Sequence, residues 1–93
     1  PQGGAGQAGG VMGVVFVISK WEDLEDCVQY ARYILYRRID HGDRVELRIK
    51  VGRLGFQGVF RKDDPELKKI LEKLRVYGAI EVERTVPDEV FLS

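Results

Sequence analysis

The sequence predicts an α+β domain with two helices on one face of a four-stranded antiparallel sheet. Apolar residues alternate with polar ones in two segments, 44–53 and 79–86, as in strands with one buried face. In two other segments, 20–39 and 65–77, apolar residues recur at the i, i+3, i+4 spacing of an amphipathic helix. The predicted order is therefore strand, helix, strand, strand, helix, strand.

The first strand is predicted at Val11–Ser19, where the chain is continuously apolar (VMGVVFVIS). Such a run is typical of a central strand that is covered on both faces or flanked by neighbours. The ten residues before it, PQGGAGQAGG, include five glycines and no residue larger than Gln, so they cannot contribute to a core. We expect a flexible Gly-rich tail at residues 1–10 and a single α+β domain at residues 11–93.

The first helix is predicted to run from about Lys20 to Ile39. Ser19 is a candidate N-cap, and Glu22 follows it at the spacing of a capping box. Gly42 is a natural helix stop in the left-handed conformation. The residues expected on the buried stripe are Leu24, Cys27, Val28, Ala31, Ile34, Leu35 and Ile39.

A hairpin is predicted after this helix. In the strand 44–53, the apolar residues fall on one side and the charged residues on the other. Glycines then punctuate the chain at positions 52, 55 and 58, which indicates a tight reversal near Gly52–Gly55. The return strand is expected at about Phe56–Lys62.

The second helix is predicted to begin at Asp63 or Asp64 as its cap, with Pro65 in its first position. Gly78 ends it, and the last strand follows at Ala79–Val86. The C-terminal tail is apolar enough that we expect it to dock or pair. The buried stripe of the second helix is expected to comprise Leu67, Ile70, Leu71 and Leu74.

Two strand–helix–strand units joined by a hairpin form the ferredoxin-like β-α-β-β-α-β plait, in which the first and third strands are central. The alternative is a three-layer α/β domain with a mostly parallel sheet, in which residues 44–60 form one long bent strand. That alternative requires both faces of the sheet to be covered.

Composition narrows the class of protein. The chain has 15 basic and 15 acidic residues, so no global charge excess draws it to nucleic acid or a membrane surface. No apolar run approaches the ~20 residues of a membrane span, and one Cys cannot form a disulfide within the chain. We expect a cytoplasmic protein. The absence of Asn and the abundance of Arg and Glu indicate a thermophile.

The hairpin is the first candidate site, because residues 44–62 hold six basic residues and one acidic residue. These cations could contact the phosphates of RNA or DNA, and Phe56 or Phe60 could stack on bases if either faces outward. The candidate nucleic-acid-binding residues are Arg44, Arg48, Lys50, Arg53, Arg61 and Lys62.

A cluster of tyrosines is the second candidate site. On the predicted first helix, Tyr33 and Tyr36 lie opposite the buried stripe and Tyr30 lies at its flank. Exposed tyrosines are typical interface anchors, because the ring gains from burial while the hydroxyl stays hydrated. These three residues predict a homo-oligomer, with a dimer favoured.

No catalytic residues, cofactor or metal are predicted. His41 lies between two aspartates in IDHGD, where a turn-forming, helix-ending role is expected. The order of elements resembles sulfur-relay proteins of the sulfur-reductase E type, which carry a reactive Cys in a loop. Here Cys27 lies on the buried stripe and is expected to be a packed thiol.

The leading functional hypothesis is a non-catalytic, homo-oligomeric binding or scaffold module. The first alternative is an RNA- or DNA-binding module that uses the basic hairpin. The second is a small sulfur-carrier-like protein or other enzyme.

Overall fold

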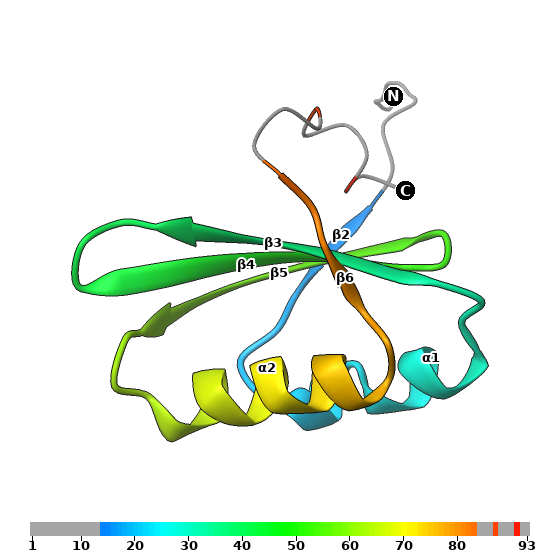
Figure 1. Ribbon diagram of the computed structural model, residues 1–93, viewed down its shortest axis with the longest axis horizontal. Helices are drawn as coiled ribbons and strands as arrows, with labels where there is room; N and C mark the ends of the chain where they lie inside the picture. The colour runs from blue at the N-terminus through cyan, green and yellow to red at the C-terminus, as the bar shows by residue number, and fades with distance from the viewer. Residues whose placement is uncertain (1–13, 84–86, 88–90, 92–93) are drawn as a thin grey trace, which may run out of the picture.

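The computed structural model describes residues 14–83, 87 and 91, which build a mixed five-stranded sheet with both helices on one face (Figure 1). The strand order across the sheet is β2-β5-β4-β3-β6. The elements in chain order are β2 (Val15–Val17), the 3₁₀ helix η1 (Trp21–Asp23), α1 (Glu25–Tyr30), β3 (Ile34–Asp40), β4 (Arg44–Val51), β5 (Leu54–Arg61), α2 (Pro65–Val76) and β6 (Ile80–Glu81).

The topology confirms the α+β class and contradicts the ferredoxin-like plait. Strands β3, β4 and β5 form an antiparallel meander, while β2 pairs parallel to β5 and β6 pairs parallel to β3. The sheet is thus neither four-stranded nor purely antiparallel. The three-layer alternative is also wrong, because α1 and α2 lie on the same side of the sheet. Each helix connects two strands that run in the same direction, as crossover connections do.

The predicted first helix, 20–39, is the origin of the error. The helix α1 ends at Tyr30, and residues 34–40 instead form β3, which pairs with β4 from Ile34↔Val51 to Asp40↔Val45. Ile34 and Ile39 fit a helical stripe, but β-branched residues also fit a strand, and the long ladder with β4 decides between the two. Gly42 therefore lies in a hairpin turn and does not end a helix.

The predicted central strand is an edge strand. In the described chain, β2 pairs only with β5, and it covers Val15–Val17 within the predicted range 11–19. The Phe16 ring lies 5.6 Å from that of Phe56, while Val17 is 84% exposed. Residues 11–13 and the predicted tail 1–10 lie outside the described residues.

The hairpin of β4 and β5 and the start of α2 are confirmed. Val51 pairs with Leu54 across the reversal, and Gly52 has the left-handed φ of 59° that a side chain would disfavour. At α2, the Asp64 carboxylate accepts a hydrogen bond from the Glu66 N–H at 2.8 Å, and Pro65 is the first helical residue.

The core lies between the helices and the sheet. The chain that follows β2 must cross β5 to reach the helical layer. It crosses at Gly58, where a Cβ would stand 2.7 Å from the Ile18 carbonyl oxygen. Only glycine permits this approach. The largest fully buried side chains are Trp21, Leu24, Leu47, Ile49, Ile70 and Leu74.

Candidate functional site

The sheet face opposite the helices gathers positive charge. Directly paired residues of neighbouring strands point to the same face, and side chains alternate along each strand. Because Leu47 and Ile49 face the helices, the charged residues between and beside them face away. In β3, β4 and β5, this helix-free face carries five cations and one carboxylate: Arg37, Arg44, Arg48, Lys50, Arg61 and Glu46.

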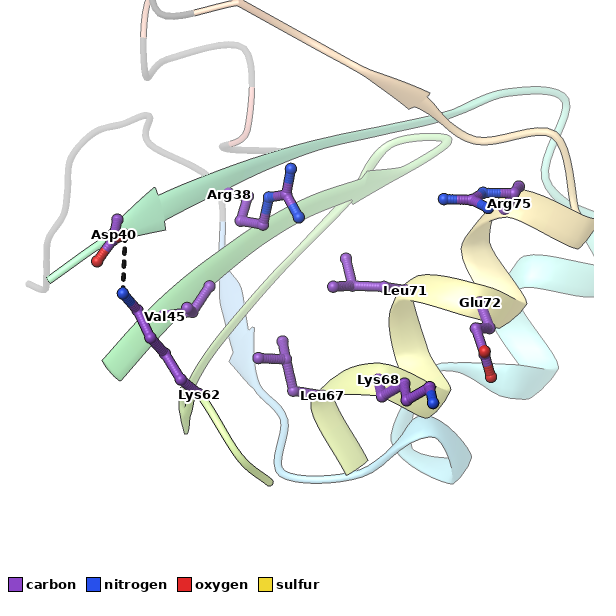
Figure 2. A pocket seen from close by; sticks show the side chains of 9 residues that line it. All are labelled: Arg38, Asp40, Val45, Lys62, Leu67, Lys68, Leu71, Glu72 and Arg75. Carbon is purple, nitrogen blue, oxygen red and sulfur yellow. Dashed lines mark ion pairs between the residues drawn. The ribbon is translucent and has the colours of Figure 1, made fainter. Parts of the chain in front are cut away.

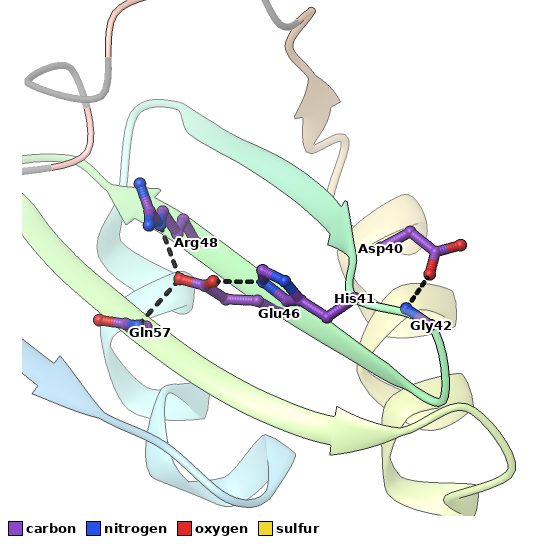
Figure 3. A network of polar contacts seen from close by, with 6 residues as sticks. All are labelled: Asp40, His41, Gly42, Glu46, Arg48 and Gln57. Carbon is purple, nitrogen blue, oxygen red and sulfur yellow. Dashed lines mark hydrogen bonds and ion pairs between the residues drawn. The ribbon is translucent and has the colours of Figure 1, made fainter.

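The carboxylate of Glu46 is the centre of a polar network on this face (Figure 3). Its Oε2 accepts hydrogen bonds from Arg48 Nε at 2.8 Å and from Gln57 Nε2 at 2.9 Å. Its Oε1 lies 2.9 Å from His41 Nε2. Glu46 is only 6% exposed, so these three partners stabilise a carboxylate that is largely removed from water.

The same contacts keep Glu46 ionised. Burial raises the pKa of this carboxyl. The hydrogen bonds from Arg48 and His41 and the charges of both residues lower the pKa by more, so the net shift is downward. The sequence predicted Glu46 on a hydrated strand face and gave no reason to single it out. Its position as the one acid in a basic strand was the available signal.

Four of the six predicted nucleic-acid-binding residues share the helix-free face. Arg48 is held by Glu46, and Lys50 lies two residues further along β4. Arg44 stands directly opposite Arg61, so two like charges face each other across the strand pair. Arg61 also has an exposed contact of 3.6 Å with Asp63. These four cations form what we call the basic sheet face.

The other two predicted residues lie elsewhere. Arg53 is in the β4–β5 turn, at the opposite end of the hairpin from Arg44. Lys62 follows β5 and pairs with Asp40 at 3.1 Å. Because Asp40 shares its face of β3 with the half-buried Tyr36, which packs on the core, Lys62 turns toward the helix side.

Neither phenylalanine of the hairpin is available for base stacking. Phe56 and Phe60 are buried in the core beneath the helices. The aromatic residue on the helix-free side is Phe91, whose ring centroid lies 5.2 Å from Arg37 Cζ. Both residues are buried. At Phe91, the one described residue of its last five, the C-terminal tail therefore docks as expected.

The three predicted interface tyrosines do not share a helix face. Tyr30 is exposed at the end of α1, and Tyr33 is exposed in the loop before β3. Tyr36 lies within β3, where its hydroxyl donates to Glu81 Oε1 at 3.4 Å and burial raises its pKa. The prediction that the three tyrosines share a surface is therefore wrong, because it assumed helical spacing and the helix ends at Tyr30.

The cysteine and the histidine of the described chain do not form a second polar cluster like that of Glu46. Cys27 is half-buried against the core, and His41 lies in the β3–β4 turn and contacts Glu46. Among residues 14–83, 87 and 91, no group of three or more His, Cys, Asp and Glu side chains is placed to hold a metal ion. No helix in this part of the chain has the length and apolar character to span a bilayer.

No protein-family model, curated protein or solved structure matches the chain. Function must therefore be inferred from the residues themselves.

Proposed function

We propose that this protein binds the phosphate backbone of nucleic acid through the basic sheet face. The observation that supports this proposal is the concentration of cations on one face of a protein with zero net charge. On that face of the meander, five cations accompany one carboxylate, and this carboxylate is already neutralised by its hydrogen-bond partners. A local positive field attracts a polyanion even where the total charge is zero.

Acidic residues are concentrated on the opposite side of the molecule. The elements η1 and α1 carry Glu22, Asp23, Glu25 and Asp26 in the helical layer. One acid, Glu22, pairs with Lys69 of α2 at 2.7 Å. The molecule therefore has a positive sheet side and an acidic η1–α1 segment, whereas α2, in the same helical layer, carries cations and acids together: Lys68, Lys69, Lys73 and Arg75 beside Glu66 and Glu72.

One exposed like-charged pair on the sheet favours an anionic partner. Arg44 stands opposite Arg61 and both are exposed, whereas Arg37, opposite Arg48, is buried beneath Phe91 and donates to the Glu83 carbonyl. Like charges in directly opposed positions destabilise a sheet. Phosphate oxygens placed between such arginines replace this repulsion with charge-assisted hydrogen bonds.

The arrangement fits contact with the backbone and not with stacked bases. Phe56 and Phe60 face the core, so the hairpin offers no aromatic platform of the kind that holds single-stranded bases. From Arg44 to Lys50 the cations extend over roughly 20 Å, at the rise of a strand. We therefore expect weak dependence on sequence and strong dependence on salt, for RNA and DNA alike.

Fluorescence anisotropy with labelled single-stranded and duplex RNA and DNA tests this proposal. The test variant is R44Q/K50Q/R61Q, which removes three cations from exposed or half-exposed positions. The matched control is K20Q/K69Q/K73Q, which removes three cations from the loop before η1 and from α2. Arg48 is left in place, because its removal would leave Glu46 buried without its ion pair.

We expect the sheet-face variant to lose at least about tenfold in affinity at low salt, and the control variant to change by less than about threefold. Equal losses in both variants would show that binding follows net charge and not the sheet face. Absence of binding by the native protein at low salt would contradict the proposal directly.

A specific observation favours self-association as a second candidate function. The edge strand β2 consists of Val15, Phe16 and Val17, with no charged residue or proline to discourage pairing. At the other edge, β6 carries Glu81 and is followed by Glu83. An exposed apolar edge of this kind can accept the same strand of a second copy.

Sedimentation of V17K separates this edge from the tyrosines. Because Val17 is highly exposed, the lysine is accommodated without disturbing the core. If β2 forms the interface, V17K is monomeric at concentrations where the native protein dimerises, and Y30S/Y33S still dimerises. The reverse result would assign the interface to the tyrosines, and a monomeric native protein would remove this candidate.

A further inference from the structure

A groove lies on the helix side of the sheet, between α2 and the end of β3 (Figure 2). It arises because α2 packs over β5, while β6 pairs with β3 only at Leu35 and Tyr36. On the helix side, no helix or strand of the described residues therefore covers the half of β3 that follows Tyr36. The groove has a volume of about 700 Å³, within the range of small-molecule sites.

The floor of this groove is aliphatic. Leu67 and Leu71 project from α2 toward Val45 of β4. Leu67 and Val45 are buried, and Leu71 is half-buried against the core. The apolar area that remains accessible here can accept the hydrocarbon part of a ligand.

Two arginines from different elements face each other across one end of the groove. Arg38 projects from β3 and Arg75 from α2 (Figure 2). Both lie near the Tyr36 hydroxyl: burial and Glu81 raise the pKa of this hydroxyl, whereas the positive charges of Arg38 and Arg75 oppose the rise. Arg38 has a contact of 3.5 Å with Glu81, and both of these side chains are about half exposed, so the pair is weak.

The other end of the groove is already neutralised. Lys62 pairs there with Asp40 at 3.1 Å. The groove is therefore polar with a balanced charge at one end, aliphatic along its floor and lined by two guanidinium groups at the other end, while Lys68 and Glu72 of α2 complete the lining. Paired guanidinium groups are suited to carboxylate and phosphate, which they bind through two parallel hydrogen bonds.

We propose that this groove binds a small amphipathic anion, a molecule with one carboxylate or phosphate group joined to an aliphatic body. Arg38 and Arg75 receive the anionic group, and the hydrocarbon body lies along Leu67, Leu71 and Val45. This ligand brings a negative charge to the two arginines and covers the part of the aliphatic floor that is still accessible. The site is separate from the basic sheet face, because it lies on the opposite side of the sheet.

Nuclear magnetic resonance titration of the ¹⁵N-labelled full chain tests this proposal with four probes. Octanoate and octyl phosphate carry both required features and distinguish the two anions. Octanol carries only the hydrocarbon body, and inorganic phosphate carries only the charge. We expect octanoate or octyl phosphate to shift the amide signals of Leu67, Leu71 and Val45, with at least about tenfold higher affinity than octanol. Inorganic phosphate leaves the signals of the floor unchanged.

The test variant is R38Q/R75Q, and the matched control is K69Q/K73Q, which removes two cations from the opposite flank of α2. We expect about tenfold weaker binding of the anionic probe by the test variant and less than about twofold change in the control. Equal effects of the two variants, equal affinity for octanol, or no shift with either amphipathic probe at about 5 mM would overturn the proposal.

Nucleic-acid binding provides an independent readout. R38Q/R75Q should retain the affinity of the native protein for RNA and DNA, because both arginines lie on the helix side. If this variant loses nucleic-acid affinity to the same extent as R44Q/K50Q/R61Q, the groove belongs to a polyanion-binding surface, and the proposal of a small-molecule site is wrong.

Discussion

Arg48 donates a hydrogen bond from Nε to Glu46 Oε2 at 2.8 Å, within the same strand and on the same face. The carboxylate thereby orients the guanidinium against β4. Since Gln57 of β5 donates to the same oxygen, the position of Glu46 is fixed across two strands. Glu46, the one acid that β3, β4 and β5 carry on this face, thus acts as a positioning residue for a cation in the proposed interface.

Replacing Glu46 with Gln should make stability less dependent on acid. The folded-state pKa of Glu46 is below its ordinary value of 4.5, so its contribution is present above that pH and is lost as pH falls through the folded pKa. At pH 7, we expect E46Q to be about 1–3 kcal/mol less stable than the native protein. Urea unfolding should show this difference shrinking as the pH falls below 4.5. A difference that does not change with pH would contradict the ionised network.

Replacing Gly58 with Ala should destabilise the fold. The added Cβ would stand 2.7 Å from the Ile18 carbonyl oxygen and 2.8 Å from Phe60 Cε1, so the backbone of one strand must move. We expect a loss of about 1–3 kcal/mol in the free energy of unfolding. The control is G52N, because Gly52 has nothing within 4 Å and Asn tolerates its positive φ. If thermal unfolding shows G58A to be as stable as G52N, the chain after β2 does not cross β5 at Gly58.

Replacing Asp64 with Ala should weaken the start of α2. Its side chain accepts the Glu66 N–H, and loss of an N-cap typically costs about 0.5–2 kcal/mol. The adjacent D63A is a matched control, since Asp63 is exposed and contacts the exposed Arg61 at 3.6 Å. Helical circular dichroism and urea unfolding should separate the two variants, and equal stability would argue against Asp64 as the cap.

The features that the sequence predicted correctly depend on local chemistry. Alternation in 44–51 established a strand, Gly52 established its reversal, and Asp64–Pro65 established the helix start. Each pattern has one favourable local structure. The basic hairpin followed from the same local patterns, and four of its six cations do lie on one face.

The predictions that were wrong concern features that depend on contacts between residues far apart in the sequence. Residues 34–39 satisfy the spacing of both a helix and a strand, and only the ladder with β4 selects the strand. The apolar run around Phe16 gives no sign that its second edge lies unpaired in the described sheet. Arg37 was assigned to a helix, so its place on the sheet beneath Phe91 could not be predicted.

The salt dependence of duplex DNA affinity tests the central claim most directly. If Arg44, Arg48, Lys50 and Arg61 each neutralise a phosphate, the logarithm of the binding constant should fall with the logarithm of salt concentration at a slope of about −3.5. In R44Q/K50Q/R61Q, the slope should fall to about −1, while K20Q/K69Q/K73Q should retain the native slope. A native slope near zero, or the same slope in the native protein and the sheet-face variant, would contradict phosphate binding by this face.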